Sequence, residues 1–307
     1  MVRQLSTQGN LVHTIDLQFQ GFTSAIASYL IPHQRGALLV ECGPGSTITN
    51  LQASLESQGY SVTDISDVLV THIHLDHAGA SGWFAQNGAR IHVHPVGAPH
   101  LINPSKLLSS AGRIYGEEMD LLWGQFLPVP EELIIIHQDR EFFEVGGLVF
   151  QALDTPGHAN HHFAYIFGDI CFSGDIGGVR IPGSNHVRLP MPPPEFHLEK
   201  WRHSLEVLHQ GEFAHILPTH FGAYSDPKQH LLAVEKALAD VERWMEDTLP
   251  RDLPHDDLKA EFHQWEEERA QAAGIDPQLM NIYQTANPSW ISINGVERYW
   301  RKYRHNP

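Results

Sequence analysis

The chain has 307 residues, of which 42% are apolar and 18% are charged, and this composition is typical of a globular protein and excludes a disordered one. Its 36 Asp and Glu residues outnumber its 20 Lys and Arg residues, so the formal net charge of −16 argues against nucleic acid as the main partner, because phosphates bind to basic surfaces. No apolar run is long enough for a membrane span, so we expect no membrane partner. No secretory signal is evident, and Cys42 and Cys171 form no CxxC motif. We therefore expect a cytoplasmic protein.

The first part of the chain alternates predicted strands with single helices. Segment 11–31 is rich in β-forming residues, and ALLVECGPG at 37–45 predicts a buried strand that runs into a glycine turn. Residues 49–59 predict a helix with Leu51 and Leu55 on one face. This alternation is typical of a layered α/β protein in which helices cover sheets.

The next segments continue this pattern and then change. Strands are predicted around 64–72 and between 132 and 175, with helical segments after Asn103-Pro104. Beyond a proline-rich joint near residue 194, helices dominate. We therefore predict a domain at 1–225 and a helical extension at 226–307, which caps or flanks the active site.

Histidine is unusually frequent, with 22 residues in the chain, and four potential metal ligands crowd into HIHLDH. His72 and His74 are two residues apart at the end of an apolar strand, so they face the same side. Asp76 and His77 follow at the expected start of a helix. A lone HxH could be a pair of solvated loop histidines, but this denser motif favours a site for two adjacent metal ions.

Three more potential ligands stand where predicted strands end. His158 lies in TPGHA, Asp175 in SGD and His220 in PTHFG. Each of them alone could be an ordinary turn or strand-end residue. Because functional groups collect on loops that a rigid sheet supports, we expect these side chains to meet at one sheet edge.

The motifs HIHLDH, TPGHA, SGD and PTHFG, in this order, resemble those of the metallo-β-lactamase-fold hydrolases, and the resemblance covers about residues 11–225. It implies an α/β fold, an αββα four-layer sandwich, with a dinuclear site at one edge. Within the fold, the chain is most similar to the glyoxalase II-like and thioesterase-like branch. The implied ligands are His72, His74 and His158 for one metal, Asp76, His77 and His220 for the other, and Asp175 between them.

The resemblance implies two divalent metal ions, and imidazole and carboxylate ligands suit zinc, iron or manganese. Such a pair shares a hydroxide that attacks an acyl bond, with Asp76 and Asp175 as catalytic residues. The expected substrate is a small thioester, or else a lactone. A phosphodiesterase or nuclease of the same fold and a metal-stabilised sensor without catalysis stay as alternatives.

One position departs from the family pattern. Glu41 in LLVECGPG stands where the family often has Asp. Its carboxylate could orient a metal-bound histidine. Alternatively, Glu41 is a surface glutamate beside a turn.

Other residues have two interpretations each. Tyr224 could donate a hydrogen bond to an oxyanion or pack in the core. The side chains of Arg180, His186 and Arg188 could hold an anionic substrate group or be solvated in a loop. His161 could contact the site or simply begin a strand, and the same holds for His162.

The end of the chain is basic. Arg298, Arg301, Lys302 and Arg304 could bind a phosphate or an anionic carrier, or they could compensate the carbonyl end of a helix. The C-terminal helices could also pair in a homodimer.

Overall fold

The computed structural model describes residues 3–7 and 9–304. In this part of the chain, one sheet has seven strands in the order β1-β2-β3-β4-β5-β6-β7, and a second has five in the order β12-β11-β10-β9-β8. The strands are β1 (Arg3–Thr7), β2 (Asn10–Asp16), β3 (Ala27–His33), β4 (Gly36–Val40), β5 (Ile65–Leu69), β6 (Arg90–Val93), β7 (Ile134–Ile136), β8 (Phe142–Val145), β9 (Leu148–Asp154), β10 (Phe163–Phe167), β11 (Ile170–Phe172) and β12 (His215–Leu217).

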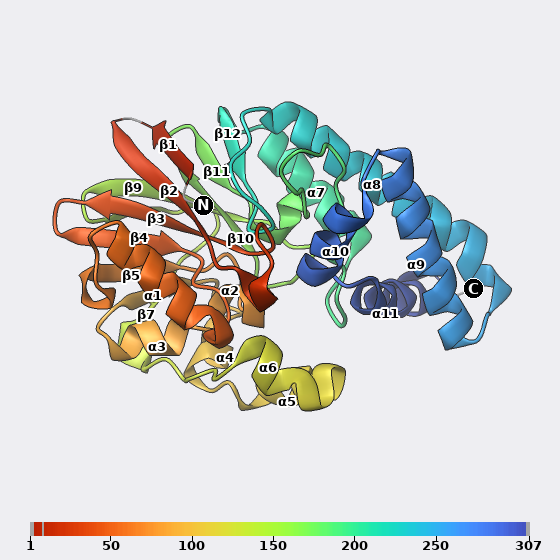
Figure 1. Cartoon of the computed structure of the whole chain (residues 1–307), viewed down its shortest axis with the longest axis horizontal. Helices are drawn as coiled ribbons and strands as arrows, with labels where there is room; N and C mark the ends of the chain where they lie inside the picture. Colours follow the sequence, from red (N-terminus) through yellow and green to blue (C-terminus); the bar gives the residue numbers. More distant parts are fainter. Residues whose placement is uncertain (1–2, 8, 305–307) are drawn as a thin grey trace.

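Helices surround these sheets and form most of the last third of the chain (Figure 1). The α-helices are α1 (Ile48–Ser57), α2 (Leu75–Ala78), α3 (Ser81–Gln86), α4 (Ala98–Ile102), α5 (Ser105–Tyr115), α6 (Met119–Trp123), α7 (Leu198–His209), α8 (Pro227–Thr248), α9 (His255–Ala272), α10 (Pro277–Ala286) and α11 (Ser289–Tyr299). A short 3-10 turn, η6 (Gly174–Gly177), follows β11, and a π-helical turn, Trp300–Arg304, follows α11. In the described residues, no helix has both the length and the apolar character of a membrane span.

Alternation along the strands produces the layers. In β4, Leu38 and Val40 face the five-stranded sheet, whereas Ala37 and Leu39 face the cluster that holds α1 and α3. In β10, Tyr165 lies between the sheets and Ala164 faces the outer helices. The order is therefore helix, sheet, sheet, helix, which confirms the predicted αββα sandwich.

Helix α8 belongs to the outer helical layer. Its residues Leu231 and Val234 lie in the same apolar cluster as Trp201 and Leu205 of α7 and Ile216 of β12. The chain beyond residue 225 thus begins with a helix that helps to cover the five-stranded sheet. Helices α9, α10 and α11 follow it as additional elements (Figure 1).

The parallel strand pairs determine where the polar loops gather. Strands β4 and β5 pair in parallel, and so do β11 and β12. The carboxyl ends of parallel strands meet at one edge of a sheet, so the loops after them come together. Those loops contain Glu41, His72, Asp175 and His220.

Candidate metal centre

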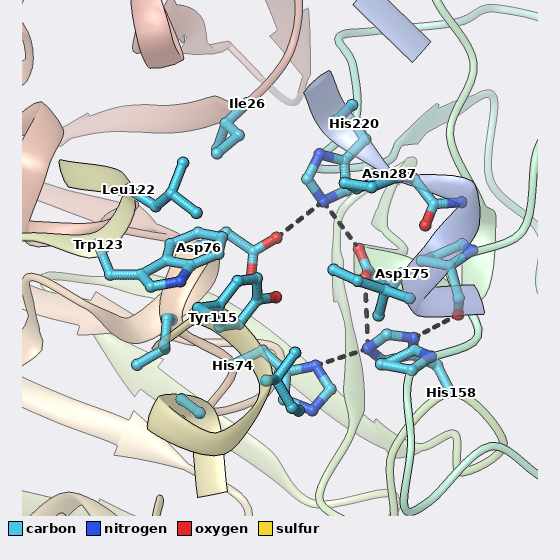
Figure 2. Close-up of a pocket in the computed structure, with 18 of the residues that line it drawn as sticks. Ile26, His74, Asp76, Tyr115, Leu122, Trp123, His158, Asp175, His220 and Asn287 are labelled. Atoms are coloured by element: carbon cyan, nitrogen blue, oxygen red, sulfur yellow. Dashed lines mark hydrogen bonds and ion pairs between the residues drawn. The ribbon is translucent and has the colours of Figure 1, made fainter. Parts of the chain in front are cut away.

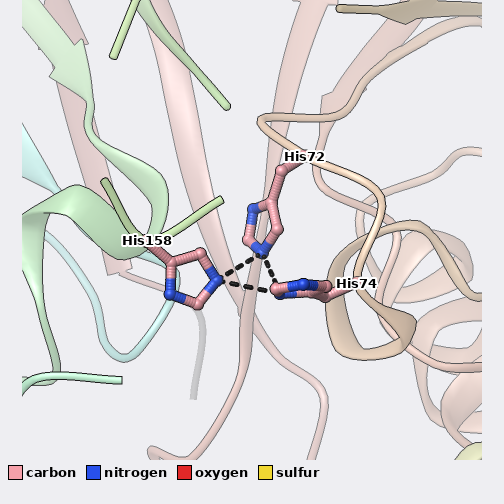
Figure 3. Close-up of side chains that lie close together, drawn as sticks. All are labelled: His72, His74 and His158. Atoms are coloured by element: carbon pink, nitrogen blue, oxygen red, sulfur yellow. Dashed lines mark hydrogen bonds between the residues drawn. The ribbon is translucent and has the colours of Figure 1, made fainter. Parts of the chain in front are cut away.

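Three histidines converge on one point (Figure 3). Nε2 of His72 lies 3.0 Å from Nδ1 of His74 and 3.1 Å from Nε2 of His158, and the His158 and His74 nitrogens are 2.8 Å apart. His72 and His74 come from the loop between β5 and α2, and His158 from the turn after β9. All three nitrogens could contact one ion.

A second group lies beside the first. Nε2 of His220 is 3.3 Å from Oδ2 of Asp76, and Asp76, His77 and His220 form another possible ligand set. Asp175 lies between the groups: Oδ1 is 3.2 Å from Nε2 of His77, and Oδ2 is 3.3 Å from Nε2 of His158. The structure therefore brings together all seven of the residues that the motifs predict as ligands.

The outer nitrogens of these rings are held by acceptors. Nδ1 of His158 donates to the carbonyl oxygen of Pro190 at 2.7 Å, and Nδ1 of His220 donates to that of Ala25 at 2.8 Å. A carbonyl cannot donate, so Nδ1 carries the hydrogen in both rings. In its neutral form, each ring then directs a bare Nε2 lone pair toward the centre, as a metal-binding histidine requires.

Two buried atoms of the cluster face each other without a proper hydrogen bond. Nε2 of His77 and Oδ1 of Asp175 lie 3.2 Å apart, and neither makes a hydrogen bond of good geometry within the described residues. Unpaired buried polar atoms are costly, and facing lone pairs repel each other. A cation would relieve both problems, so this donor set fits a divalent metal site.

Burial and neighbouring charges shift the pKa values in the cluster. Burial, with help from His158, lowers the pKa of His74 to about 3. Burial alone would raise the pKa of Asp76, but the charge of His77 overcomes this and lowers it to about 2. The pKa of His77 shifts in the opposite direction. Burial alone would lower it, but the charges of Asp175, Asp76 and Glu41 raise it well above the usual value. Carboxylate ligands are thus ionised, and a metal ion must displace a proton from His77.

Glu41 is fully buried behind His77 and is not a surface glutamate. Its Oε1 accepts from Nδ1 of His77 at 3.0 Å and from the hydroxyl of Thr219 at 3.1 Å, and the hydroxyl of Thr71 donates to the same oxygen. Its backbone has φ of 65°, a left-handed conformation that few residues other than glycine adopt. This geometry matches the predicted orienting role.

A comparison with protein families agrees with this geometry. The model of the metallo-beta-lactamase superfamily matches residues 22–220. The chain belongs to the metallo-beta-lactamase superfamily. The predicted resemblance is therefore confirmed, and the metal-binding donor set is one that suits a superfamily hydrolase.

Curated relatives carry related names. A metallo-beta-lactamase fold-containing protein of Sulfurisphaera tokodaii is 25% identical over 64% of this chain and 72% of its own. A hydroxyacylglutathione hydrolase of Rhodopseudomonas palustris is 35% identical over 39% of this chain and 34% of its own. An atrochrysone carboxyl ACP thioesterase of Aspergillus fumigatus is 29% identical over 52% of this chain and 41% of its own. The chain thus spans well under half the length of the last two.

Solved structures share the fold over nearly the whole chain. An archaeal superfamily protein from Sulfolobus tokodaii has a TM-score of 0.67 and 18% identity, covering 93% of this chain and 97% of its own. A metallo-beta-lactamase family protein from Thermus thermophilus has a TM-score of 0.64 and 20% identity, covering 95% of this chain and 93% of its own. This coverage includes C-terminal helices, so the fold extends beyond the matched domain.

The cluster of predicted metal ligands opens into a cavity of about 750 Å³ (Figure 2). Five of the seven predicted ligands line it, and they are His74, Asp76, His158, Asp175 and His220. Figure 2 shows Tyr115 and Trp123 on the side of Asp76, and Asn287 on the side of His220. The proposed metal ligands therefore form the polar end of an accessible cavity.

His161 and Glu195 also line the cavity. Nε2 of His161 lies 3.1 Å from Oε2 of Glu195, and its ring centroid lies 5.4 Å from that of His74. His162 has a different position, because its Nε2 accepts from the backbone N–H of Asp175 at 3.1 Å. His161 thus adjoins the site, whereas His162 holds the loop that carries Asp175. Glu195 was missed because it follows a proline-rich joint without a recognisable motif.

Tyr224 contacts Arg180, and its predicted hydrogen bond to an oxyanion stays a prediction. Its hydroxyl donates to the carbonyl oxygen of Arg180, and its ring lies 4.2 Å below the Arg180 guanidinium. Tyr224 is also absent from the described cavity lining. The packing interpretation is therefore the one that the structure favours.

The three predicted substrate contacts stay predictions, and none of these residues is among the described residues that line the cavity. Arg180 is buried and makes two 2.9 Å hydrogen bonds to the carboxylate of Asp226. Arg188 is buried against Glu266, with Nε 2.9 Å from Oε1. His186 packs on Tyr283, and burial lowers its pKa to about 4. These residues join the loop after Asp175 to the C-terminal helices.

The basic tail is divided between two environments. Arg304 lies in ion pairs with Glu199 and Glu242, and so it ties the chain end to α7 and α8. Arg298 and Lys302 are exposed, and Arg301 of the π-helical turn pairs with Glu297 of α11. Most of the tail charge is thus explained by intramolecular contacts or by solvation.

Proposed function

We propose that the protein is a dinuclear-metal-dependent hydrolase of acyl bonds, with thioesters as the preferred class. One observation carries the proposal: two ligand groups meet at Asp175, at the polar end of a cavity. His72, His74 and His158 would hold one ion, and Asp76, His77 and His220 the other. Zinc, iron and manganese all suit these ligands.

The bound ions would supply a water of lowered pKa and polarise the substrate carbonyl. The protein contributes fixed geometry. The carbonyl groups of Pro190 and Ala25 hold His158 and His220, and Glu41 holds His77. Asp76 stays ionised at neutral pH because its pKa is lowered to about 2 by His77 despite burial. Ligands that are already oriented need no rearrangement during the reaction.

The relatives support an acyl thioester as substrate class. Two of them are named hydroxyacylglutathione hydrolase and ACP thioesterase. Both names describe cleavage of a thioester, although this chain matches only 34% and 41% of their lengths. A lactone is the second candidate, because it presents the same type of carbonyl to the same end of the cavity.

A phosphodiesterase or nuclease reaction is less well supported. Lys106 is the one Lys or Arg among the described residues that line the cavity. Extended nucleic acid binding uses many such cations, and the net charge is −16.

The test measures hydrolysis of acyl-CoA and glutathione thioesters and of homoserine lactones by protein loaded with zinc, iron or manganese. We expect thioester turnover that falls by about 100-fold or more in Asp76→Asn, because a metal contact is lost. Asp120→Asn is the matched control, since Asp120 is exposed on α6 and outside the described cavity lining. Absence of thioester turnover with every ion would overturn the proposal, and lactone cleavage alone would replace it with the second candidate.

A further inference from the structure

The cavity extends far beyond the predicted metal ligands. Its walls come from the loop around Phe19, from helices α4 to α6, and from the α10–α11 region around Trp290. The polar atoms of the cluster lie at one end, as Figure 2 shows, whereas side chains such as Leu122 and Ile26 form the wall near Asp76. The lining therefore has a polar end and an apolar body.

Aromatic rings connect the three wall segments. The Phe19 and Trp123 rings stack with centroids 5.5 Å apart, and Tyr115 lies 5.0 Å from Trp123. Tyr115 also contacts Trp290, with centroids 6.0 Å apart. These four residues belong to a loop, α5, α6 and α11, and all of them line the cavity. A continuous aromatic surface of this kind favours flat or flexible apolar ligands.

Exposed apolar side chains also gather at this cavity. Phe22, Val96, Leu121 and Trp290 all line it, and Leu121 is 77% exposed. They are four of the ten large apolar residues that are exposed in the described part of the chain. An apolar rim around a cavity is typical of a site that removes apolar surface of a ligand from water.

The charges in the lining point to the same kind of ligand. Lys106 is the one Lys or Arg there, while Glu118 and Glu195 add negative charge outside the ligand set. An anionic acyl group would thus find little compensation inside the cavity. An uncharged apolar group could bury its surface there without a compensating charge.

We infer that this cavity binds the acyl part of the substrate and selects long apolar acyl chains, with Phe19, Tyr115, Trp123 and Trp290 as specificity-determining residues. The inference rests on the proposed acyl hydrolysis. The scissile carbonyl would lie at the end formed by Asp76, Asp175 and His220, and the acyl chain would extend along the apolar wall. Hydrolysis then breaks the acyl–sulfur bond and adds water, releasing a carboxylic acid and the thiol.

The first experiment compares acetyl, butanoyl, hexanoyl and octanoyl thioesters of one small neutral thiol. Each buried methylene should raise kcat/KM by about fourfold until the cavity is filled. Equal kcat/KM values for acetyl and octanoyl thioesters would overturn the inference while leaving the proposed hydrolase intact.

Substitutions in the cavity wall test which residues produce the preference for long acyl chains. Leu121→Gln and Trp290→Ala should each lower the octanoyl-to-acetyl ratio of kcat/KM, together by about tenfold. Leu232→Gln is the matched control, because Leu232 is 57% exposed on α8 and outside the described lining. A ratio that falls equally in Leu232→Gln would contradict the assignment of these residues.

A binding measurement separates this inference from the proposed reaction. Octanol and butanol are titrated into metal-free protein, and the tryptophan fluorescence is followed, since Trp123 and Trp290 line the cavity. We expect octanol to bind more tightly than butanol by about tenfold or more, and we expect Trp290→Ala to weaken this preference. Absence of thioester hydrolysis would overturn the proposed function only. A preference for octanol over butanol below about twofold would overturn the apolar acyl site, whether or not thioesters are hydrolysed.

Discussion

Glu41 accepts a hydrogen bond of 3.0 Å from Nδ1 of His77, and both side chains are completely buried. The same carboxylate accepts from Thr71 and Thr219, so it connects the loops after β4, β5 and β12. One buried acid thus orients a proposed metal ligand and ties three strand ends together. Carboxylates behind metal-bound histidines orient the ring in many metal sites.

Glu41→Gln should weaken metal binding by about 10- to 100-fold, because the amide brings an N–H₂ group against donors and removes a charge that stabilises His77 as a ligand. The measurement is a competition titration of zinc against a chromophoric chelator. Glu56→Gln on the exposed face of α1 is the matched control. Zinc affinity equal to that of the unaltered chain would show that Glu41 has no orienting role.

Two histidines of the segment HANHH (158–162), His158 and His161, should differ in metal binding. His158→Ala should reduce the metal content of the purified protein, because Nε2 of His158 lies 3.1 Å or less from the His72 and His74 nitrogens. His161→Asn should keep that content, because Nε2 of His161 is directed to Glu195 at 3.1 Å. Elemental analysis of both variants after loading and desalting checks this difference, and equal losses would contradict it.

The ligand set was predictable because each of its residues follows the end of a strand within eight positions. A buried strand is visible as a local apolar pattern, and parallel pairing brings the following loops together, as in the pairs β4–β5 and β11–β12. The position of Asp175 between two groups of histidines follows from this topology. The sandwich itself was predictable from the resemblance of the motifs to a known family.

Other features depend on contacts between distant segments. Arg188 pairs with Glu266, which lies 78 positions away on α9, and no local pattern indicates that pairing. The burial of Arg188 contradicts the solvated-loop interpretation, and the substrate interpretation stays a prediction. The cavity wall likewise depends on distant contacts, because Phe19 stacks on Trp123 of α6 and Trp290 of α11 contacts Tyr115 of α5. Long-range packing, rather than periodicity, decides such contacts.

The Arg188–Glu266 ion pair should stabilise the fold and leave substrate binding little changed. Arg188→Met leaves the buried Glu266 carboxylate without its charge partner, so the free energy of unfolding should fall by about 3–5 kcal/mol. The double variant Arg188→Met with Glu266→Leu should recover much of this loss, because it removes both buried charges. Urea unfolding measures all variants, and a large change of KM without loss of stability would instead favour a substrate contact.

His230 should make stability depend on pH. It is buried in α8, where its Nε2 donates to the carbonyl oxygen of Gly177 at 2.7 Å and Arg180 lies 3.3 Å from Nδ1. Burial lowers its pKa to about 4; the Gly177 hydrogen bond and Asp226 oppose this shift, and Arg180 adds to it. The native state therefore prefers the neutral ring, and the unfolded chain binds the proton more readily.

Because the unfolded pKa is about 6.5, this contribution to stability is complete above that pH and is lost as the pH falls toward 4, by about 3 kcal/mol in total. Urea unfolding at pH 7.5 and 5 should show a smaller pH difference for His230→Gln than for the unaltered chain. The Gln side chain can still donate to Gly177 but does not titrate. His203→Gln, at an exposed position of α7, should keep the full difference. If His230→Gln and His203→Gln retain the same pH dependence, His230 does not supply it.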